Sequence, residues 1–129
     1  MIKYLQNSLL LVVFFFFISG AKAQLPYFES FREATAQNIT FGGAPSAFLT
    51  ASNNGPTGTA IDPAGQGFLR LTNNTTNQKG FVYSTVNFPS NQGLTIQFEY
   101  YTWGGNGADG ISFFLFDATV PTFNIGGFG

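Results

Sequence analysis

The sequence predicts an all-β fold, an antiparallel sandwich or barrel, for the chain that follows an N-terminal apolar segment. Short runs with alternating apolar and polar side chains recur along this part, and clusters of Gly, Pro, Asn and Asp separate them at regular intervals. No segment after Gln24 has a convincing 3.6-residue helical period. Aromatic residues make up 18% of the chain and charged residues only 9%, which excludes simple disorder because much apolar surface is available for burial.

The first 23 residues have the three parts of a cleavable secretory signal peptide in the right order. Lys3 supplies positive charge, Leu9 to Ile18 is an unbroken apolar run, and Ala21-Lys22-Ala23 offers small residues for cleavage. An uncleaved membrane anchor is the weaker alternative, because ten apolar residues fall short of the roughly 20 that span a bilayer. We therefore expect cleavage between Ala23 and Gln24 and a secreted, extracellular or cell-surface protein comprising residues 24 to 129.

The charge balance of the mature chain argues against nucleic acid as a partner. Removal of residues 1 to 23 leaves three basic and six acidic residues, a net charge of about −3. Nucleic-acid binding needs clustered Lys and Arg to neutralise phosphates, so nucleic acid is not an expected partner. The mature chain is also expected to contain no membrane-spanning segment. The chain contains no Cys, so it forms no disulfides and offers no Cys for a lipid anchor. Its stability must come from packing.

The elements are expected in the following order. Residues 27 to 37 are interpreted as irregular, because the helical spacing of Phe28, Phe31 and Ala34 is interrupted and leads into a Gly-Gly pair. Strands follow, each rich in β-branched and aromatic residues. They span residues 67–72, 80–88 and 94–103, with turn-forming clusters at 52–58, 62–65, 73–77 and 104–107.

The later strands are expected to contribute most of the core. In the run 94–103 one face carries Ile96, Phe98 and Tyr100, which predicts a strand with one buried face. The run Ile111 to Phe116 is apolar almost throughout, so we expect both faces to be covered in the centre of a sheet. The chain then ends in a glycine-rich stretch, and because sandwiches commonly reach roughly 200 residues, we expect residues 24 to 129 to be the N-terminal part of a larger, truncated domain.

The stretch from Gly107 to Asp117 resembles L-type, legume-lectin-like lectins. Members of that family carry Ala-Asp-Gly followed by a hydrophobic Phe-Phe strand, which Ala108-Asp109-Gly110 and Ile111 to Leu115 match closely. The segments 68–72, 80–83 and 98–100 fall in the order of the family's early strands, and Gly126 to Gly129 looks like the start of its glycine-rich loop. The resemblance covers residues 27 to 129, although only the Ala-Asp-Gly strand is distinctive.

The resemblance implies a jelly-roll, concanavalin-like sandwich that binds glycans or glycoconjugates at one edge. Asp109 would accept hydrogen bonds from two sugar hydroxyls, flanked by Ala108 and Gly110, and the loop containing Gly127 and Gly129 would contribute a backbone amide. The family also uses calcium, usually beside a transition metal, and the ligands for these ions would lie beyond Gly129. The metal ligands are therefore not expected within this chain.

The chemistry of the motif agrees with sugar binding but leaves alternatives open. An ionised carboxylate is an acceptor only and can take two hydroxyl donors, while Gly107 and Gly110 let a ligand approach the backbone. Asp-Gly between strands is also ordinary hairpin-turn chemistry. Tyr100, Tyr101 and Trp103 could stack on a sugar ring, but aromatic residues on a strand are more often part of a core.

Catalysis is not expected. The chain has no His and no Cys, and Glu99 stands alone on its strand, whereas a glycosidase ordinarily uses two carboxylates. The runner-up to a lectin is a structural or adhesin module without a sugar site. A sandwich-fold glycoside hydrolase whose catalytic residues lie beyond Gly129 is the least favoured alternative.

Overall fold

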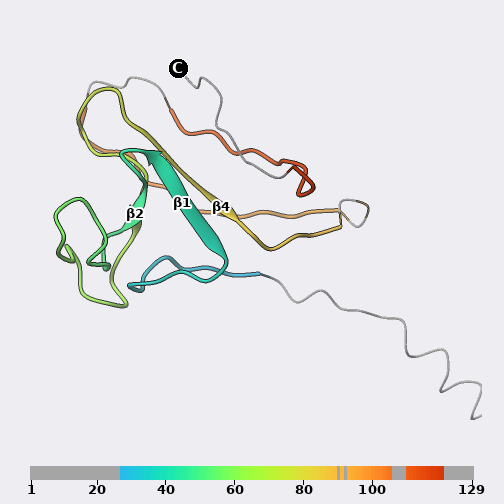
Figure 1. Cartoon of the computed structure of the whole chain (residues 1–129), viewed down its shortest axis with the longest axis horizontal. Coiled ribbons are helices and arrows are strands. Elements are labelled where there is room, and N and C mark those ends of the chain that lie inside the picture. The colour runs from blue at the N-terminus through green and yellow to red at the C-terminus, as the bar shows by residue number, and fades with distance from the viewer. Residues whose placement is uncertain (1–26, 90, 92, 106–109, 121–129) are drawn as a thin grey trace, which may run out of the picture.

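A computed structural model of the chain describes residues 27–89, 91, 93–105 and 110–120 (Figure 1). These residues contain no helix, and therefore no helix that is long and apolar enough to cross a membrane. They form short antiparallel strands, as the all-β prediction requires. The strands are β1 (Ile39–Ala44), β2 (Phe48–Leu49), β3 (Leu69–Arg70) and β4 (Lys79–Ser84).

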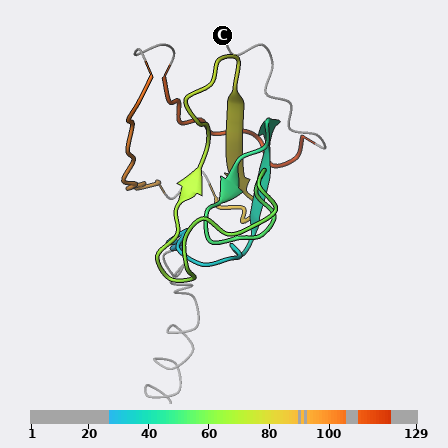
Figure 2. The ribbon, with the colours of Figure 1, turned by 90° about the vertical axis from the view of Figure 1, so that its left-hand side faces the viewer.

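The four strands make two antiparallel pairs, one nested inside the other in sequence. β1 pairs with β4 in a register that places Ile39 opposite Ser84 and Gly43 opposite Gly80. β2 pairs with β3, with Phe48 opposite Arg70. Figure 2 shows the short β2–β3 pair beside the longer β1–β4 pair.

Two adjacent glycines allow β1 to lie close against β4. A Cβ on Gly42 would lie 2.2 Å from Cζ of Phe81, so the aromatic ring occupies the space that a side chain would fill. Gly43 has a φ of +123°, and its Cβ would lie 1.9 Å from the carbonyl oxygen of Lys79. The sequence pattern did not predict β1, because glycines are normally depleted in strands and read as a turn.

The buried centre of the described residues is the segment from Ala47 to Ser52. Ala47, Leu49 and Ala51 are 3%, 4% and 6% exposed, and the polar residues Thr50 and Ser52 are buried beside them. Small side chains dominate this core. Because these side chains are small, backbone hydrogen bonds also contribute to the stability of this core, together with the burial of apolar groups.

Thr50 joins three segments of the chain through all of its polar groups. Its amide donates to the carbonyl of Phe68 over 2.9 Å, and the amide of Phe68 donates back to Thr50 Oγ1 over 2.8 Å. Its carbonyl accepts from the amides of Ile61 and Asp62 at 2.7 and 3.1 Å. Thr50 thus supplies the partners that buried polar groups require.

The substitution Thr50→Val is expected to destabilise the protein by about 1 to 3 kcal/mol, because the part-buried amide of Phe68 loses its acceptor while the shape of the side chain is kept. Urea denaturation followed by circular dichroism measures the change. The control is Thr57→Val, whose hydroxyl bonds the carbonyl of Thr59 at an exposed site; it should change stability by no more than about 0.5 kcal/mol. Equal effects of the two substitutions would contradict the role assigned to Thr50.

The irregular conformation expected for residues 27 to 37 is confirmed. The carboxylate of Glu29 accepts from the amides of Phe31 and Gln37 over 2.8 and 3.3 Å, which folds the segment back on itself. The carbonyl of Arg32 accepts from the amides of Gly65 and Gly67, each over 3.0 Å. The Arg32 guanidinium also lies 5.6 Å from the centre of the Phe68 ring. These contacts attach the segment to the chain leading into β3.

Two of the predicted strands are confirmed in part. β3 covers only two residues within the predicted run 67–72. β4 covers the first half of the predicted run 80–88 and begins one residue earlier, at Lys79. Beyond β4, the amide of Thr85 donates to the carbonyl of Asn38 over 2.8 Å, which continues the contact with the β1 side.

The other two strand predictions are wrong for the described residues. Neither 94–103 nor 111–116 forms a strand, and within the described ranges no backbone–backbone hydrogen bond is recorded for 94–103. Ile111, Phe113 and Leu115 are 47%, 56% and 61% exposed, so the run expected to be covered on both faces is open. Alternating apolar residues indicate that a segment could form a half-buried strand of a sheet. Burial also requires a second layer that covers the apolar face, and the described residues do not supply one.

Candidate functional site

The residues predicted to bind sugar lie mostly outside the described residues. Gly110 is the one that the structure describes; it is exposed, and no atom lies within 4 Å of where its Cβ would be. The others are Ala108, Asp109, Gly127 and Gly129, and the predicted cleavage residues Ala23 and Gln24 also fall outside the described ranges. The described part of the site therefore consists of the segments that lead into and out of residues 106–109.

The incoming segment ends in a turn made by two glycines, Gly104 and Gly105, which have φ angles of +70° and +71°. Such angles favour glycine, which explains the Gly-Gly pair at this position. Before the turn, Tyr100, Tyr101 and Trp103 are 59%, 68% and 73% exposed. These three aromatic side chains are thus not buried by the other described residues.

Aromatic contacts hold the two segments against the strands. Tyr101 meets the ring of Phe68 edge-on, with ring centres 6.5 Å apart. Phe98 of the incoming segment stacks on Phe113 of the outgoing one at 6.0 Å and an interplanar angle of 17°. Phe116 then meets Tyr83 of β4 edge-on at 5.5 Å. Such ring pairs contribute about 0.5 to 1.5 kcal/mol each beyond area burial, so they position segments that make no strand.

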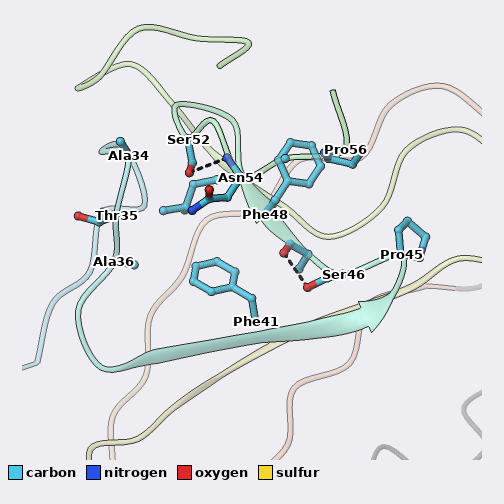
Figure 3. A pocket seen from close by; sticks show the side chains of 13 residues that line it. Ala34, Thr35, Ala36, Phe41, Pro45, Ser46, Phe48, Ser52, Asn54 and Pro56 are labelled. Carbon is cyan, nitrogen blue, oxygen red and sulfur yellow. Dashed lines mark hydrogen bonds between the residues drawn. The ribbon is translucent and has the colours of Figure 1, made fainter. Parts of the chain in front are cut away.

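A separate groove of about 570 Å³ lies between β1, β2 and the irregular N-terminal segment (Figure 3). Its Ser hydroxyls are already engaged: Ser46 donates to the carbonyl of Ala47 over 3.1 Å, and Ser52 accepts from the amide of Asn54 over 3.2 Å. The lining residues are Ala34, Thr35, Ala36, Phe41, Pro45, Ser46, Ala47, Phe48, Leu49, Ser52, Asn54, Gly55 and Pro56. None of them ionises, so the groove lacks acid–base or nucleophilic chemistry. Sequence reasoning did not identify it, because three separate segments form it without any motif.

Two titratable groups of the described residues, Asp117 and Tyr27, have pKa values that local contacts shift. The Asp117 carboxylate accepts from the amide and the hydroxyl of Thr119, each over 2.8 Å, and these hydrogen bonds lower its pKa. Partial burial raises the pKa of Tyr27, and the charge of Glu29 adds to this effect. Asp117 therefore stabilises a turn, in keeping with the absence of any functional assignment to it from sequence.

The described residues also hold no set of side chains that fits a metal ion. Within the ranges that the structure covers, no three His, Cys, Asp or Glu side chains gather in one place. Calcium in proteins takes six to eight oxygen ligands, several of them carboxylates.

No protein-family model matches the chain, and neither does any curated protein or solved structure. The resemblance to L-type lectins therefore depends on the residues of the Ala108-Asp109-Gly110 motif and the run that follows it.

Proposed function

We propose that this protein is a secreted or cell-surface carbohydrate-binding module of L-type lectin character, without catalytic activity. The observation that carries the proposal is the sequence Ala108-Asp109-Gly110 directly before the apolar run Ile111 to Leu115. In this proposal Asp109 accepts hydrogen bonds from two sugar hydroxyls. Backbone amides of the glycine-rich loop around Gly127 and Gly129 donate to the same sugar.

The described surroundings of the motif support this use. Gly110 is exposed and has open space at its Cβ position, so a ligand can approach the backbone there. Gly105 likewise has open space at its Cβ position, and exposed aromatic side chains precede it. Flat apolar rings beside hydrogen-bonding groups suit sugars, which carry both C–H faces and hydroxyls.

The proposal includes a jelly-roll sandwich as the complete fold. Its support is an apolar face shared by the segments that Phe98 and Phe113 join. The members of this face are 43 to 61% exposed and would pack against a second layer of a sandwich. They are Ile96, Phe98, Tyr100, Ile111, Phe113 and Leu115. Calcium dependence follows from the resemblance alone.

The substitution Asp109→Asn is expected to weaken glycan binding at least tenfold. One carboxylate oxygen becomes an NH₂ donor, which faces a sugar hydroxyl in place of an acceptor. Charge-assisted hydrogen bonds contribute roughly 1.5 to 3 kcal/mol each, and every 1.4 kcal/mol lost lowers affinity about tenfold. Calorimetry of the complete protein with methyl glycosides of mannose, glucose, galactose and N-acetylglucosamine, in the presence of calcium, measures the affinity.

The matched control is Glu33→Gln, the same change of chemistry at an exposed position in the N-terminal segment, and it should leave the affinity unchanged. Thermal unfolding of both variants is measured in parallel. Unchanged affinity in the Asp109 variant would refute the sugar site. Lost affinity together with a much lower melting temperature would assign Asp109 a structural role instead.

A second candidate function is a structural or adhesin module that contacts proteins or polymers. The exposed apolar face of residues 96–100 and 111–115 favours it, because large exposed apolar patches mark interaction surfaces. Such a module would bind none of the methyl glycosides, so the same calorimetry separates the two candidates.

A further inference from the structure

The loop between Ser52 and Gly58 carries an Asn-Gly pair, Asn54-Gly55, in the lining of the groove beside β1 and β2 (Figure 3). Asn54 is exposed, so water reaches its side chain. Asparagine is a thermolabile residue, because the backbone nitrogen of the next residue can attack its amide carbon. Glycine hinders this attack least, since it has no side chain. The pair therefore has the two residue types that intramolecular deamidation requires.

The two reacting groups of this pair make no hydrogen bonds to other described residues. Within the described ranges the amide nitrogen of Gly55 donates to no acceptor, and the side-chain amide of Asn54 has no partner. The preceding Asn53 differs, because its Oδ1 accepts from the amide of Ala60 over 3.0 Å. The Asn54 side chain can thus turn toward the Gly55 nitrogen without losing such a bond, whereas Asn53 would first have to break one.

Hydrogen bonds hold the loop at atoms that do not take part in the reaction. The amide of Asn54 donates to Oγ of Ser52 over 3.2 Å. The amide of Gly58 donates to the carbonyl of Gly55 over 3.0 Å, which closes a turn that contains Pro56. These two bonds order the loop and leave the Gly55 nitrogen and the Asn54 amide carbon unengaged.

Packing explains why a glycine follows Asn54. A Cβ on Gly55 would lie 2.8 Å from Cδ2 of Phe48, so the aromatic ring occupies the space that a side chain would fill. A larger residue at this position would slow deamidation, but it would also clash with the ring. The contact with Phe48 therefore requires the labile pair.

We propose that Asn54 deamidates spontaneously in the folded protein through a cyclic imide formed with Gly55. The Gly55 nitrogen bonds to Cγ of Asn54, the bond from Cγ to Nδ2 breaks, and ammonia leaves with the proton from the Gly55 nitrogen. Water then adds across one of the two carbon–nitrogen bonds of the imide ring that join the two residues. Opening at Cγ gives aspartate, and opening at the main-chain carbonyl carbon gives isoaspartate.

Either product turns a neutral groove into an anionic one. The residues that line the groove include no ionisable side chain before the reaction. A carboxyl group with an ordinary pKa of about 4 is ionised near neutral pH, so the groove would then repel anionic ligands. Isoaspartate also adds a methylene group to the backbone before Gly55, which displaces this residue relative to the Phe48 ring. The modification is independent of the proposed sugar site.

The test follows each asparagine while the protein stays folded. The complete protein is incubated at mildly alkaline pH, where the attacking nitrogen loses its proton more readily, and circular dichroism confirms that the fold is kept. Peptide mapping by mass spectrometry then assigns every deamidated position. We expect Asn54 to convert about tenfold faster than Asn53, and about as fast as in protein unfolded in urea. Asn106-Gly107, the other Asn-Gly pair of the sequence, is mapped separately.

Two matched variants complete the experiment. Asn54→Gln should abolish conversion at this position, because glutamine would have to form a larger ring. Asn53→Gln should leave the conversion of Asn54 unchanged. Native ion exchange should separate a more acidic form in proportion to that conversion. Asn54 that stays intact in the folded protein but deamidates in urea would overturn the proposal, because the fold would then keep the two groups apart. Equal rates at Asn53 and Asn54 would also overturn it.

Discussion

The substitution Gly43→Ala is expected to separate β1 from β4. The added Cβ would lie 1.9 Å from the carbonyl oxygen of Lys79 and 2.8 Å from Cα of Gly80, both backbone atoms that cannot move without breaking the strand pair. The φ of +123° also lies where residues other than glycine are strained by about 1 to 3 kcal/mol. We expect a loss of about 4 kcal/mol or more, measured as the shift of the urea midpoint with circular dichroism as the probe.

Substitutions at two other glycines separate the two effects expected at Gly43, the steric clash of the added Cβ and the strain of the positive φ angle. Gly58 has a φ of +68° and open space around its Cβ position, so Gly58→Ala should cost only about 1 kcal/mol. Gly80 has no positive φ, but its Cβ would lie 1.8 Å from the carbonyl oxygen of Leu71, so Gly80→Ala isolates the clash. If Gly43→Ala were no more harmful than Gly58→Ala, the close approach of β1 and β4 would be refuted.

The second large effect is expected at Leu49, the largest of the buried apolar side chains in the segment Ala47 to Ser52. It is 4% exposed, and its backbone pairs with Leu69 across β2 and β3. Leu49→Ala removes three methylene-sized groups and leaves a cavity next to the groove, which costs about 2 to 5 kcal/mol. Thermal and urea denaturation should both show the loss.

Leu94→Ala provides the control for this prediction. Leu94 is 45% exposed, so the same truncation removes little buried surface and should change stability by less than about 1 kcal/mol. A small effect at Leu49 would mean that the Ala47–Ser52 segment is not the centre of the core. A large effect at Leu94 would mean that residues 94–103 are buried in solution.

The sequence pattern located two of the four strands that the structure describes, β3 and β4. The β4 region was found because Phe81, Val82 and Tyr83 are typical strand formers. β1 was missed because Gly42 and Gly43 lower its strand propensity. These glycines leave room for Phe81 and Lys79, which come from a distant part of the chain. The segments 94–103 and 111–116 have the best strand patterns, yet the described structure gives them no strand partner. Pattern measures local preference, whereas pairing depends on residues far away in sequence.

The candidate site was inferred from its chemistry alone. Asp109 was proposed as a sugar ligand from its motif, and it lies outside the described residues. The exposure of Trp103 could not be predicted, because aromatic residues at strand positions are usually buried.

The nesting of β2 and β3 between β1 and β4 has a kinetic consequence. Pairing β1 with β4 closes a long stretch of chain, and the entropy lost in closing a loop rises with its length. Formation of the β2–β3 pair, with the four hydrogen bonds that Thr50 makes, first shortens the flexible chain between Ala44 and Lys79. The inner pair thereby lowers the entropic barrier for the outer one. We therefore expect Thr50, which is buried directly after β2, to influence how fast the outer strands pair.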